Sequence, residues 1–308
     1  MPSLSLPSST AVQPRALFAA CLAATWFIWG STYLGIKWAL VSLPPFLQMG
    51  SRFVAAAVVL GLWAAWRGAR WPNRSQWLGA SVLGALLVGG GYGFTAVAQT
   101  HVSSAMVVAF IAISPALIAL GQWHYGVRPQ KLEVAGIVLG VAGVVLLVQG
   151  DSFAAAPAGI AAQAFACVCW SLGSVWAMHG LPGGFKLQVA EGAAGWASQM
   201  FAGGLMLLAA GTLLGEQVAW PIDPRALLSW VYLVVAGTLV AYTAYMVLLQ
   251  HVSAALASSY AFVNPVIGMV LGTTLGAELV SRGEWIAAGV ITTGVLLILL
   301  AKRQPRAA

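Results

Sequence analysis

Aromatic side chains occupy the middle of several apolar segments, where they could bind a hydrophobic molecule. Trp26, Trp29 and Tyr33 follow an i, i+3, i+7 spacing, so they share one face of a helix. Taken singly, each ring could equally face lipid or fill a core. A buried phenol or indole needs a hydrogen-bond partner, however, which favours the interior of a bundle. We therefore predict an aromatic-lined, substrate-binding cavity formed by Trp26, Trp29, Tyr33, Tyr92, Trp170, Tyr242 and Tyr245.

Buried amides and two prolines lie in the same kind of segment. Gln48, Gln163 and Asn264 could hydrogen-bond a zwitterion such as an amino acid, or they could only hold helices together. Pro115 and Pro265 each remove a backbone donor and leave a carbonyl oxygen free one turn earlier, so their helices are expected to bend there. We interpret the prolines as hinges, and the role of Asn264 stays open between hinge support and substrate contact.

Charged residues are scarce, and their positions narrow the chemistry. The 308 residues include 14 Lys or Arg and 7 Asp or Glu, which is 7%, against about 25% in a soluble domain. Every acid maps to a loop or a helix end, so no carboxylate at mid-membrane is expected to carry protons. Proton coupling would then use an end-placed acid such as Glu191 or Glu278. The alternative is that substrate moves down its own gradient.

Arg52 is the one basic residue expected inside a membrane segment, about eight residues into its helix. It could face a substrate carboxylate, snorkel to the nearby surface, or pair with another buried group. We favour snorkelling or structural pairing.

Patterns typical of enzymes and metal sites are missing from the sequence. The four histidines stand at helix ends without metal-ligand spacing, and the three cysteines lie in apolar runs. We therefore expect no enzymatic activity, no cofactor and no bound metal. The basic residues form no block of the kind that binds nucleic acid, so no nucleic-acid partner is expected.

The elements that must position these residues are long apolar runs. Hydrophobic residues make up 60% of the chain, and mean hydropathy is +0.89. A helix needs about 20 apolar residues to cross a bilayer, and the runs lack the alternation of barrel strands. The sequence thus predicts an all-α membrane protein with ten transmembrane helices. Their spans are 16–36, 44–66, 77–99, 103–123, 132–149, 158–178, 193–214, 226–249, 253–276 and 284–301.

Basic residues are distributed unevenly over the loops between these runs. Ten fall on the side that also holds both ends of the chain, and three fall on the opposite side. The positive-inside rule places the richer side, and therefore both termini, in the cytoplasm. Residues 1–15 are expected to form a disordered tail, and residues 302–308 a basic tail.

An internal repeat of about 150 residues relates the two halves of the chain. When residues 92–148 are aligned with residues 242–299, identical residues occur in the same order in both segments. Such an ordered series is not expected by chance. The front parts of the halves align in the same way. The matched pairs include Tyr92 with Tyr242, His101-Val102-Ser103 with His251-Val252-Ser253, Pro115 with Pro265, Gln48-Met49 with Gln199-Met200, and Trp29 with Trp170.

The repeat has a geometric consequence. Each half holds five helices, and because five is odd the second half must enter the membrane inverted. Inverted repeats are typical of transporters that alternate access to a site near the midplane, between the halves. We therefore predict two inverted five-helix repeats, residues 16–150 and 151–301.

Several motifs resemble those of one family. Trp29 to Tyr33 with Lys37, and Ser51 to Ala56, resemble the opening motifs of EamA-type members of the drug/metabolite transporter superfamily. Asn264-Pro265 and Gly276-Ala277-Glu278 resemble its last two helices. The resemblance covers about residues 16–301 and implies ten helices, an inner-membrane location and export of amino acids or other small metabolites. One departure is Gly126-Val127-Arg128, which lacks the acid of Glu278, so no paired-carboxylate role is expected.

The family resemblance does not identify the substrate. Cationic drugs usually require an acid at mid-membrane, and because this sequence lacks one we favour hydrophobic or aromatic amino acids over multidrug or toxic-compound efflux. The predicted partners are a small-molecule substrate and the lipid bilayer. Gly268, Gly272 and Gly276 form a ridge of small residues that would pack within the fold or at a homodimer interface.

Overall fold

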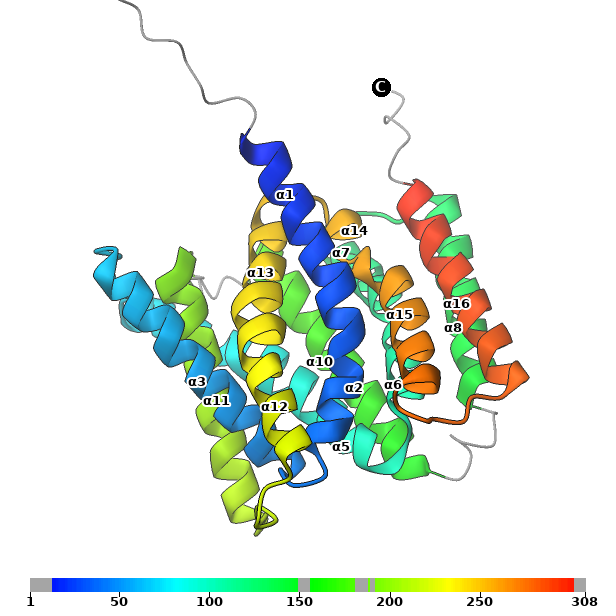
Figure 1. Cartoon of the computed structure of the whole chain (residues 1–308). Helices are drawn as coiled ribbons and strands as arrows, with labels where there is room; N and C mark the ends of the chain where they lie inside the picture. The colour runs from blue at the N-terminus through cyan, green and yellow to red at the C-terminus, as the bar shows by residue number, and fades with distance from the viewer. Residues whose placement is uncertain (1–12, 149–155, 181–187, 189–191, 302–308) are drawn as a thin grey trace, which may run out of the picture.

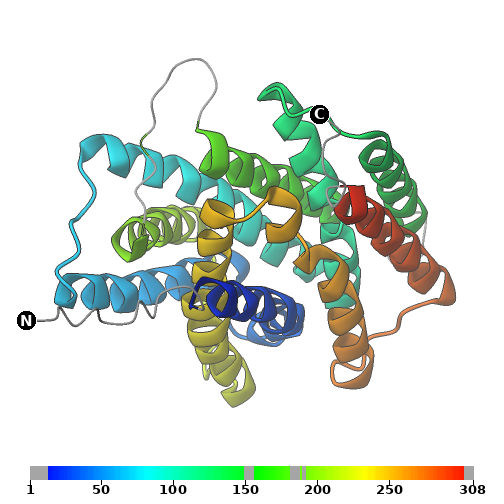
Figure 2. The same cartoon turned by 90° about the horizontal axis from the view of Figure 1, so that it is seen from above.

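A computed structural model describes residues 13–148, 156–180, 188 and 192–301. Within these ranges every regular element is a helix, and the helices pack side by side as a bundle (Figures 1 and 2). Helix α1 begins at Gln13, inside the segment predicted as a tail. The rest of that tail, the basic tail 302–308 and the predicted boundary at 150–151 lie outside the described residues, as do Asp151 and Glu191.

The first part of the chain forms helical segments that follow the predicted apolar runs closely. Three of these segments contain more than one element, because π-helical turns or a short break interrupt the α-helix. The elements are α1 Gln13–Ala23, η1 Ala24–Ile28, α2 Trp29–Ala39, α3 Pro45–Trp66, α4 Arg74–Leu83, η2 Gly84–Gly93, α5 Phe94–His101, α6 Ser104–Ile111, α7 Ser114–His124 and α8 Lys131–Val148.

The second part repeats this order of continuous and interrupted helices except in its first span, where α10 is uninterrupted. Here too, the apolar runs predicted from the sequence are helical. The elements are α10 Pro157–His179, α11 Gly192–Leu213, α12 Pro224–Tyr232, η3 Leu233–Val240, α13 Ala241–His251, α14 Ala254–Ala257, α15 Tyr260–Thr274 and α16 Arg282–Ala301.

Seven helical segments in the described part of the chain are long and apolar enough to cross a membrane. The chain is therefore a multi-pass, all-helical membrane protein. A shorter apolar helix covers Val263–Thr274 within α15, and the number of ten spans stays a prediction. The seven segments are Arg15–Ala39, Pro45–Trp66, Arg74–His101, Ser104–His124, Pro157–His179, Gly192–Leu213 and Pro224–His251.

The repeated His-Val-Ser sequence has the same local conformation in both halves. Val102 and Val252 each end a helix in extended backbone, with φ of −130° and −125°. Ser103 and Ser253 then cap the next helix, because each hydroxyl oxygen accepts from a backbone N–H three residues on, at 3.3 Å. One short motif thus builds the same helix-to-helix corner twice.

The two predicted hinge prolines lie near helix breaks, but in different ways. Pro115 stands in the first turn of α7, directly after the break that separates α6 from α7. Pro265 lies inside α15, and the break between α14 and α15 falls earlier, at Ser258 and Ser259. A proline is tolerated in a first turn, where its missing N–H has no intrahelical partner. Hinge motion at these positions stays a prediction.

Three π-helical segments were not predicted. η2 and η3 fall at matching positions of the two halves, and η2 contains the glycine run at 89–91. A π turn holds more residues than an α turn, because its backbone hydrogen bonds join residues five apart and not four. Such turns are frequent at functional sites. Here they lie on the segments that carry Trp26, Tyr92 and Thr238.

Glycines set the closest contacts between helices. Helices α8 and α16 lie side by side at one edge of the bundle (Figure 2), and a Cβ on Gly136 would lie 2.5 Å from the Gly294 carbonyl oxygen. A Cβ on Gly268 would lie 2.6 Å from Val108 on α6. The Gly268 part of the predicted ridge therefore packs within the fold.

The acidic side chains of the described residues bond to backbone N–H groups near helix starts. Glu278 accepts from Ser104 N at 2.8 Å, Ser104 Oγ at 2.9 Å and Ala105 N at 3.0 Å, at the first turn of α6. Glu216 accepts from two backbone N–H groups at the start of α3. Asp223, Glu133 and Glu284 each accept from a backbone N–H beside their own helix. These carboxylates stabilise the positive ends of helix dipoles.

Candidate functional site

A cavity lies where helices from both halves of the chain meet. Its volume is about 40 Å³, which is room for a few water molecules. Aromatic and aliphatic side chains form most of its wall, and hydroxyl, thiol and amide groups form the rest. The lining residues are Trp29, Thr32, Tyr33, Ile36, Gly91, Tyr92, Thr95, Ile111, Ser114, Gln163, Ala166, Cys167, Trp170 and Tyr260.

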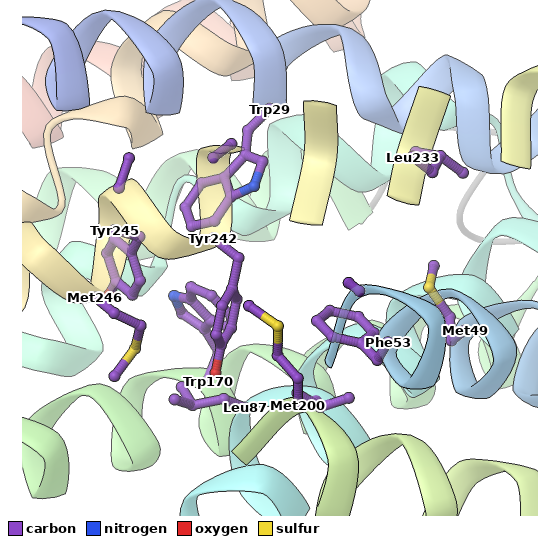
Figure 3. Close-up of a cluster of buried hydrophobic side chains, with 14 of the residues drawn as sticks. Trp29, Met49, Phe53, Leu87, Trp170, Met200, Leu233, Tyr242, Tyr245 and Met246 are labelled. Carbon is purple, nitrogen blue, oxygen red and sulfur yellow. The ribbon is translucent and has the colours of Figure 1, made fainter. Parts of the chain in front are cut away.

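Trp29 is at the centre of the aromatic cluster that forms one wall. Its ring centroid lies 5.1 Å from those of Tyr245 and Tyr260, 5.6 Å from Trp170 and 6.5 Å from Tyr92. Trp170 in turn stacks on Tyr245, with centroids 5.0 Å apart. Figure 3 shows Trp29, Trp170 and Tyr245 converging from three helices. Tilted and edge-to-face pairs of this kind add stability beyond burial alone.

Hydrogen bonds fix the orientation of these rings. The Trp29 indole N–H donates to the Gly237 carbonyl oxygen at 3.1 Å, and the Trp170 indole N–H donates to the Tyr260 hydroxyl at 2.8 Å. The Tyr245 hydroxyl is bonded to Ser174 Oγ at 2.8 Å. Each of these three polar tips therefore has a partner within the fold.

The structure brings half of the predicted binding residues to the cavity wall. Tyr242 and Tyr245 are fully buried behind that wall, where they contact other rings of the cluster. They support the cavity and do not line it. The predicted residues that line it are Trp29, Tyr33, Tyr92, Gln163 and Trp170.

Trp26, Gln48 and Asn264 do not line the cavity and bond to other segments of the chain. With its amide oriented so that the nitrogen faces these acceptors, Asn264 donates to the backbone oxygens of Trp26 at 2.7 Å and Thr25 at 3.2 Å. The Trp26 indole N–H donates to Ser259 Oγ at 2.9 Å. Gln48 Nε2 donates to the Ile36 carbonyl oxygen at 3.3 Å. Substrate contact by these three residues stays a prediction.

Two acceptors at the cavity wall have no partner among the described residues. The Gln163 amide nitrogen donates to Cys167 Sγ at 3.5 Å, but its Oε1 is buried and unbonded. The Ser114 hydroxyl is also buried and unbonded. A buried amide oxygen is costly unless something donates to it, and a hydroxyl can both donate and accept, so the Gln163 side of this wall is suited to a ligand with an N–H group.

Sequence reasoning missed Tyr260, which lines the cavity and holds the Trp170 indole. Its counterpart in the repeat is Phe110, so the matching of the halves did not single it out. The signal that selected Tyr92, a phenol in the middle of an apolar run, applies to Tyr260 equally well.

Of the two roles favoured for Arg52, snorkelling is wrong, and pairing with another buried group is confirmed. Its side chain is completely buried, and its Nε donates to Thr238 Oγ1 on η3 at 2.6 Å. The guanidinium carbon lies 5.1 Å from the Tyr92 ring centroid and 5.2 Å from that of Phe53. The side chain turns inward because α3 packs against η3 on this face, so that a buried hydroxyl and two rings replace the lipid headgroups.

The substitution Tyr260→Phe is expected to destabilise the protein more than Tyr245→Phe. Tyr260→Phe removes the acceptor of the Trp170 N–H and leaves that donor buried, which costs about 1–3 kcal/mol. After Tyr245→Phe, Ser174 Oγ still donates to the Trp170 carbonyl oxygen at 2.7 Å, so the loss is nearer 1 kcal/mol. Thermal unfolding in detergent gives the order, and equal shifts in Tm would contradict it.

Comparison with known proteins places the chain in a family. The sequence model of the EamA-like transporter family matches residues 15–149 and, separately, residues 157–300. The chain belongs to the EamA-like transporter family. It is a membrane transporter of the drug/metabolite transporter superfamily, as the motifs around Trp29 and Arg52 indicate.

Relatives of this EamA-like transporter extend over almost its whole length. It is 36% identical to the "Uncharacterized inner membrane transporter YedA" of Escherichia coli strain K12, over 93% of this chain and 91% of that protein. It is 25% identical to "Protein PecM" of Dickeya dadantii strain 3937, over 88% of each. One crystal structure matches with a TM-score of 0.68 at 23% identity, over 94% of this chain and 99% of that one, and supports the fold alone.

Proposed function

We propose that this EamA-like transporter exports hydrophobic or aromatic amino acids, and related small metabolites, by alternating access in the inner membrane. The observation that carries the proposal is the cavity walled by Trp29, Tyr92 and Trp170, with the free acceptors of Gln163 and Ser114 on the same wall. Aromatic faces suit an apolar side chain, and acceptors suit an ammonium group. The inner-membrane location rests on the name of the relative YedA.

Alternating access is proposed from the organisation of the chain. The separate family matches at 15–149 and 157–300, and the helix-to-helix corner that Ser103 and Ser253 form in each half, support two inverted five-helix repeats with ten spans in all. The excess of basic residues in the loops on one side supports both termini being cytoplasmic. The cavity of about 40 Å³ is too small for an amino acid. Substrate can therefore enter only when the two halves move apart. We propose that this movement occurs at the helix breaks near Pro115 and Pro265.

Multidrug efflux is the competing function of the same fold. In the described part of the chain, the acids bond to helix starts and none lines the cavity. A cationic drug would therefore find aromatic faces there but no counter-charge, which favours the amino-acid proposal.

Counterflow in proteoliposomes tests the proposal. Purified protein is reconstituted, loaded with unlabelled substrate, and offered labelled phenylalanine, tyrosine, tryptophan, leucine or glutamate, or a labelled organic cation, with and without a pH gradient. We expect the aromatic amino acids and leucine to accumulate at least tenfold over empty liposomes. Accumulation of the organic cation with none of the amino acids would assign drug efflux instead.

A further inference from the structure

Arg52 is a buried cation whose hydrogen-bonding capacity is largely unused. A guanidinium has five N–H donors. Nε donates to Thr238 Oγ1 at 2.6 Å, and Nη1 makes only a weak contact with Met49 Sδ at 3.6 Å. Nη2, which carries two of the donors, is buried and has no partner in the described part of the chain. The outer edge of the guanidinium is thus free to bind an acceptor.

The position of Arg52 is directly behind the aromatic wall of the cavity. Its guanidinium carbon lies 5.1 Å from the ring centroid of Tyr92, which lines the cavity. On its other side it meets Gly237, where an added Cβ would lie 2.8 Å from Nη2. The Gly237 carbonyl oxygen holds the Trp29 indole. The guanidinium is therefore in contact with one ring that lines the cavity, Tyr92, and close to the backbone that holds a second, Trp29.

No acidic side chain neutralises Arg52 within the described ranges. The carboxylates of Glu216 and Glu278 accept from the backbone N–H groups of α3 and α6. The rings of Phe53 and Tyr92 offer cation–π attraction but no acceptor for the free N–H groups. A buried cation in a membrane protein is costly without a counter-charge and is by default a functional feature.

Packing of the fold does not require an arginine here. In the matching of the halves, Arg52 corresponds to Gly203 and Thr238 to Val88. Those counterparts also meet, because a Cβ on Gly203 would lie 2.6 Å from the Val88 Cβ. Both contacts join the two halves: α11 meets η2 through a glycine and a valine, and α3 meets η3 through a buried guanidinium and a hydroxyl.

We propose that Arg52 binds the carboxylate of the transported molecule. When Trp29 and Tyr92 move apart during the transport cycle, the Nη2 edge becomes accessible from the cavity, and a carboxylate accepts from it in the paired geometry that guanidinium favours. The side chain of the substrate then lies among the aromatic rings. The inference rests on the proposed function and adds to it a requirement for a negatively charged group.

Binding of matched ligands to the purified protein in nanodiscs tests the role of Arg52 without relying on transport. Phenylpropionate carries the carboxylate and no amine, and phenethylamine carries the amine and no carboxylate. Tryptophan fluorescence reports occupancy, since Trp29 and Trp170 line the cavity. We expect wild-type protein to bind phenylpropionate at least tenfold more tightly than phenethylamine. Equal affinities, or no binding of phenylpropionate, would overturn the proposal.

Variants then assign the preference to one side chain. Arg52→Gln is expected to weaken phenylpropionate binding at least tenfold while leaving phenethylamine unchanged, and Arg52→Lys to give an intermediate loss. Arg128→Gln, the same change at an exposed position, serves as the control and is expected to bind like wild type. If Arg52→Gln weakens both ligands alike, the residue is structural. Carboxylate binding that depends on Arg52, without export of amino acids, would refute only the proposed function.

Discussion

Replacing Trp29 by alanine is expected to abolish transport and to lower the free energy of unfolding by about 3–5 kcal/mol. The side chain is only 3% exposed and touches the rings of Tyr92, Trp170, Tyr245 and Tyr260. Its loss leaves a cavity in the cluster and frees the Gly237 carbonyl oxygen. Counterflow of labelled phenylalanine measures the first effect, and thermal unfolding in detergent measures the second.

Two further variants separate the role of Trp29 from general damage. Trp66→Ala makes the same substitution where the side chain is 79% exposed, and it is expected to leave transport and Tm close to wild type. Trp29→Phe retains ring contacts but loses the bond to Gly237, so it is expected to fold and to transport at a reduced rate. Wild-type transport by Trp29→Ala would contradict an aromatic binding wall.

A single methyl group at Gly84 is expected to destabilise the protein by about 1–3 kcal/mol and to slow transport at least tenfold. Its Cβ would lie 2.5 Å from the Gln199 carbonyl oxygen and 2.9 Å from the Gly203 backbone nitrogen. Backbone atoms cannot rotate away as side chains do, so η2 and α11 must separate. Because η2 also carries Tyr92, the cavity wall moves with it.

Gly289→Ala is the matched control for Gly84→Ala, and the pair is scored by Tm and counterflow. Position 289 lies on α16, and a Cβ there meets nothing within 4 Å. Alanine is the better helix former by up to about 1 kcal/mol, so this variant is expected to be neutral or slightly stabilised. If the two substitutions had the same effect, the close approach of η2 and α11 would not be a constraint on the fold.

Sequence alone predicted the helices well because a membrane helix is recognised from neighbouring residues along the chain, without knowledge of tertiary contacts. A continuous apolar run of about 20 residues has few alternatives to a membrane helix, and α3, α10 and α11 begin and end close to the predicted limits. The interruptions were harder to predict. Prolines drew attention to two breaks, but the break before α15 falls at Ser258 and Ser259, where two hydroxyl side chains favour a turn and no proline stands.

The contact between two of the predicted aromatic residues follows from the sequence, whereas the alternatives left open for Asn264 and Arg52 have a common cause. Trp29 and Trp170 were paired through the repeat, and they do meet, with ring centroids 5.6 Å apart. The contacts of Asn264 and Arg52 depend on the direction of their side chains, and the spacing of residues along one helix does not determine that direction. Asn264 turns toward the backbone of η1, and Arg52 turns toward Thr238. Both directions are set by a neighbouring helix from a distant part of the chain.

The π-helical segment η2 makes the site sensitive to chain length as well as to residue type. In an α-helix each residue turns the chain by about 100°, and a π turn accommodates one additional residue. A deletion of one residue between Gly84 and Gly93 is therefore expected to change the winding of η2, and with it the direction in which Tyr92 points relative to Trp170. A homologue with the same tyrosine but a one-residue deletion in this segment would therefore present it to a different face, so an aligned tyrosine is evidence of a shared cavity only where the segment lengths also agree.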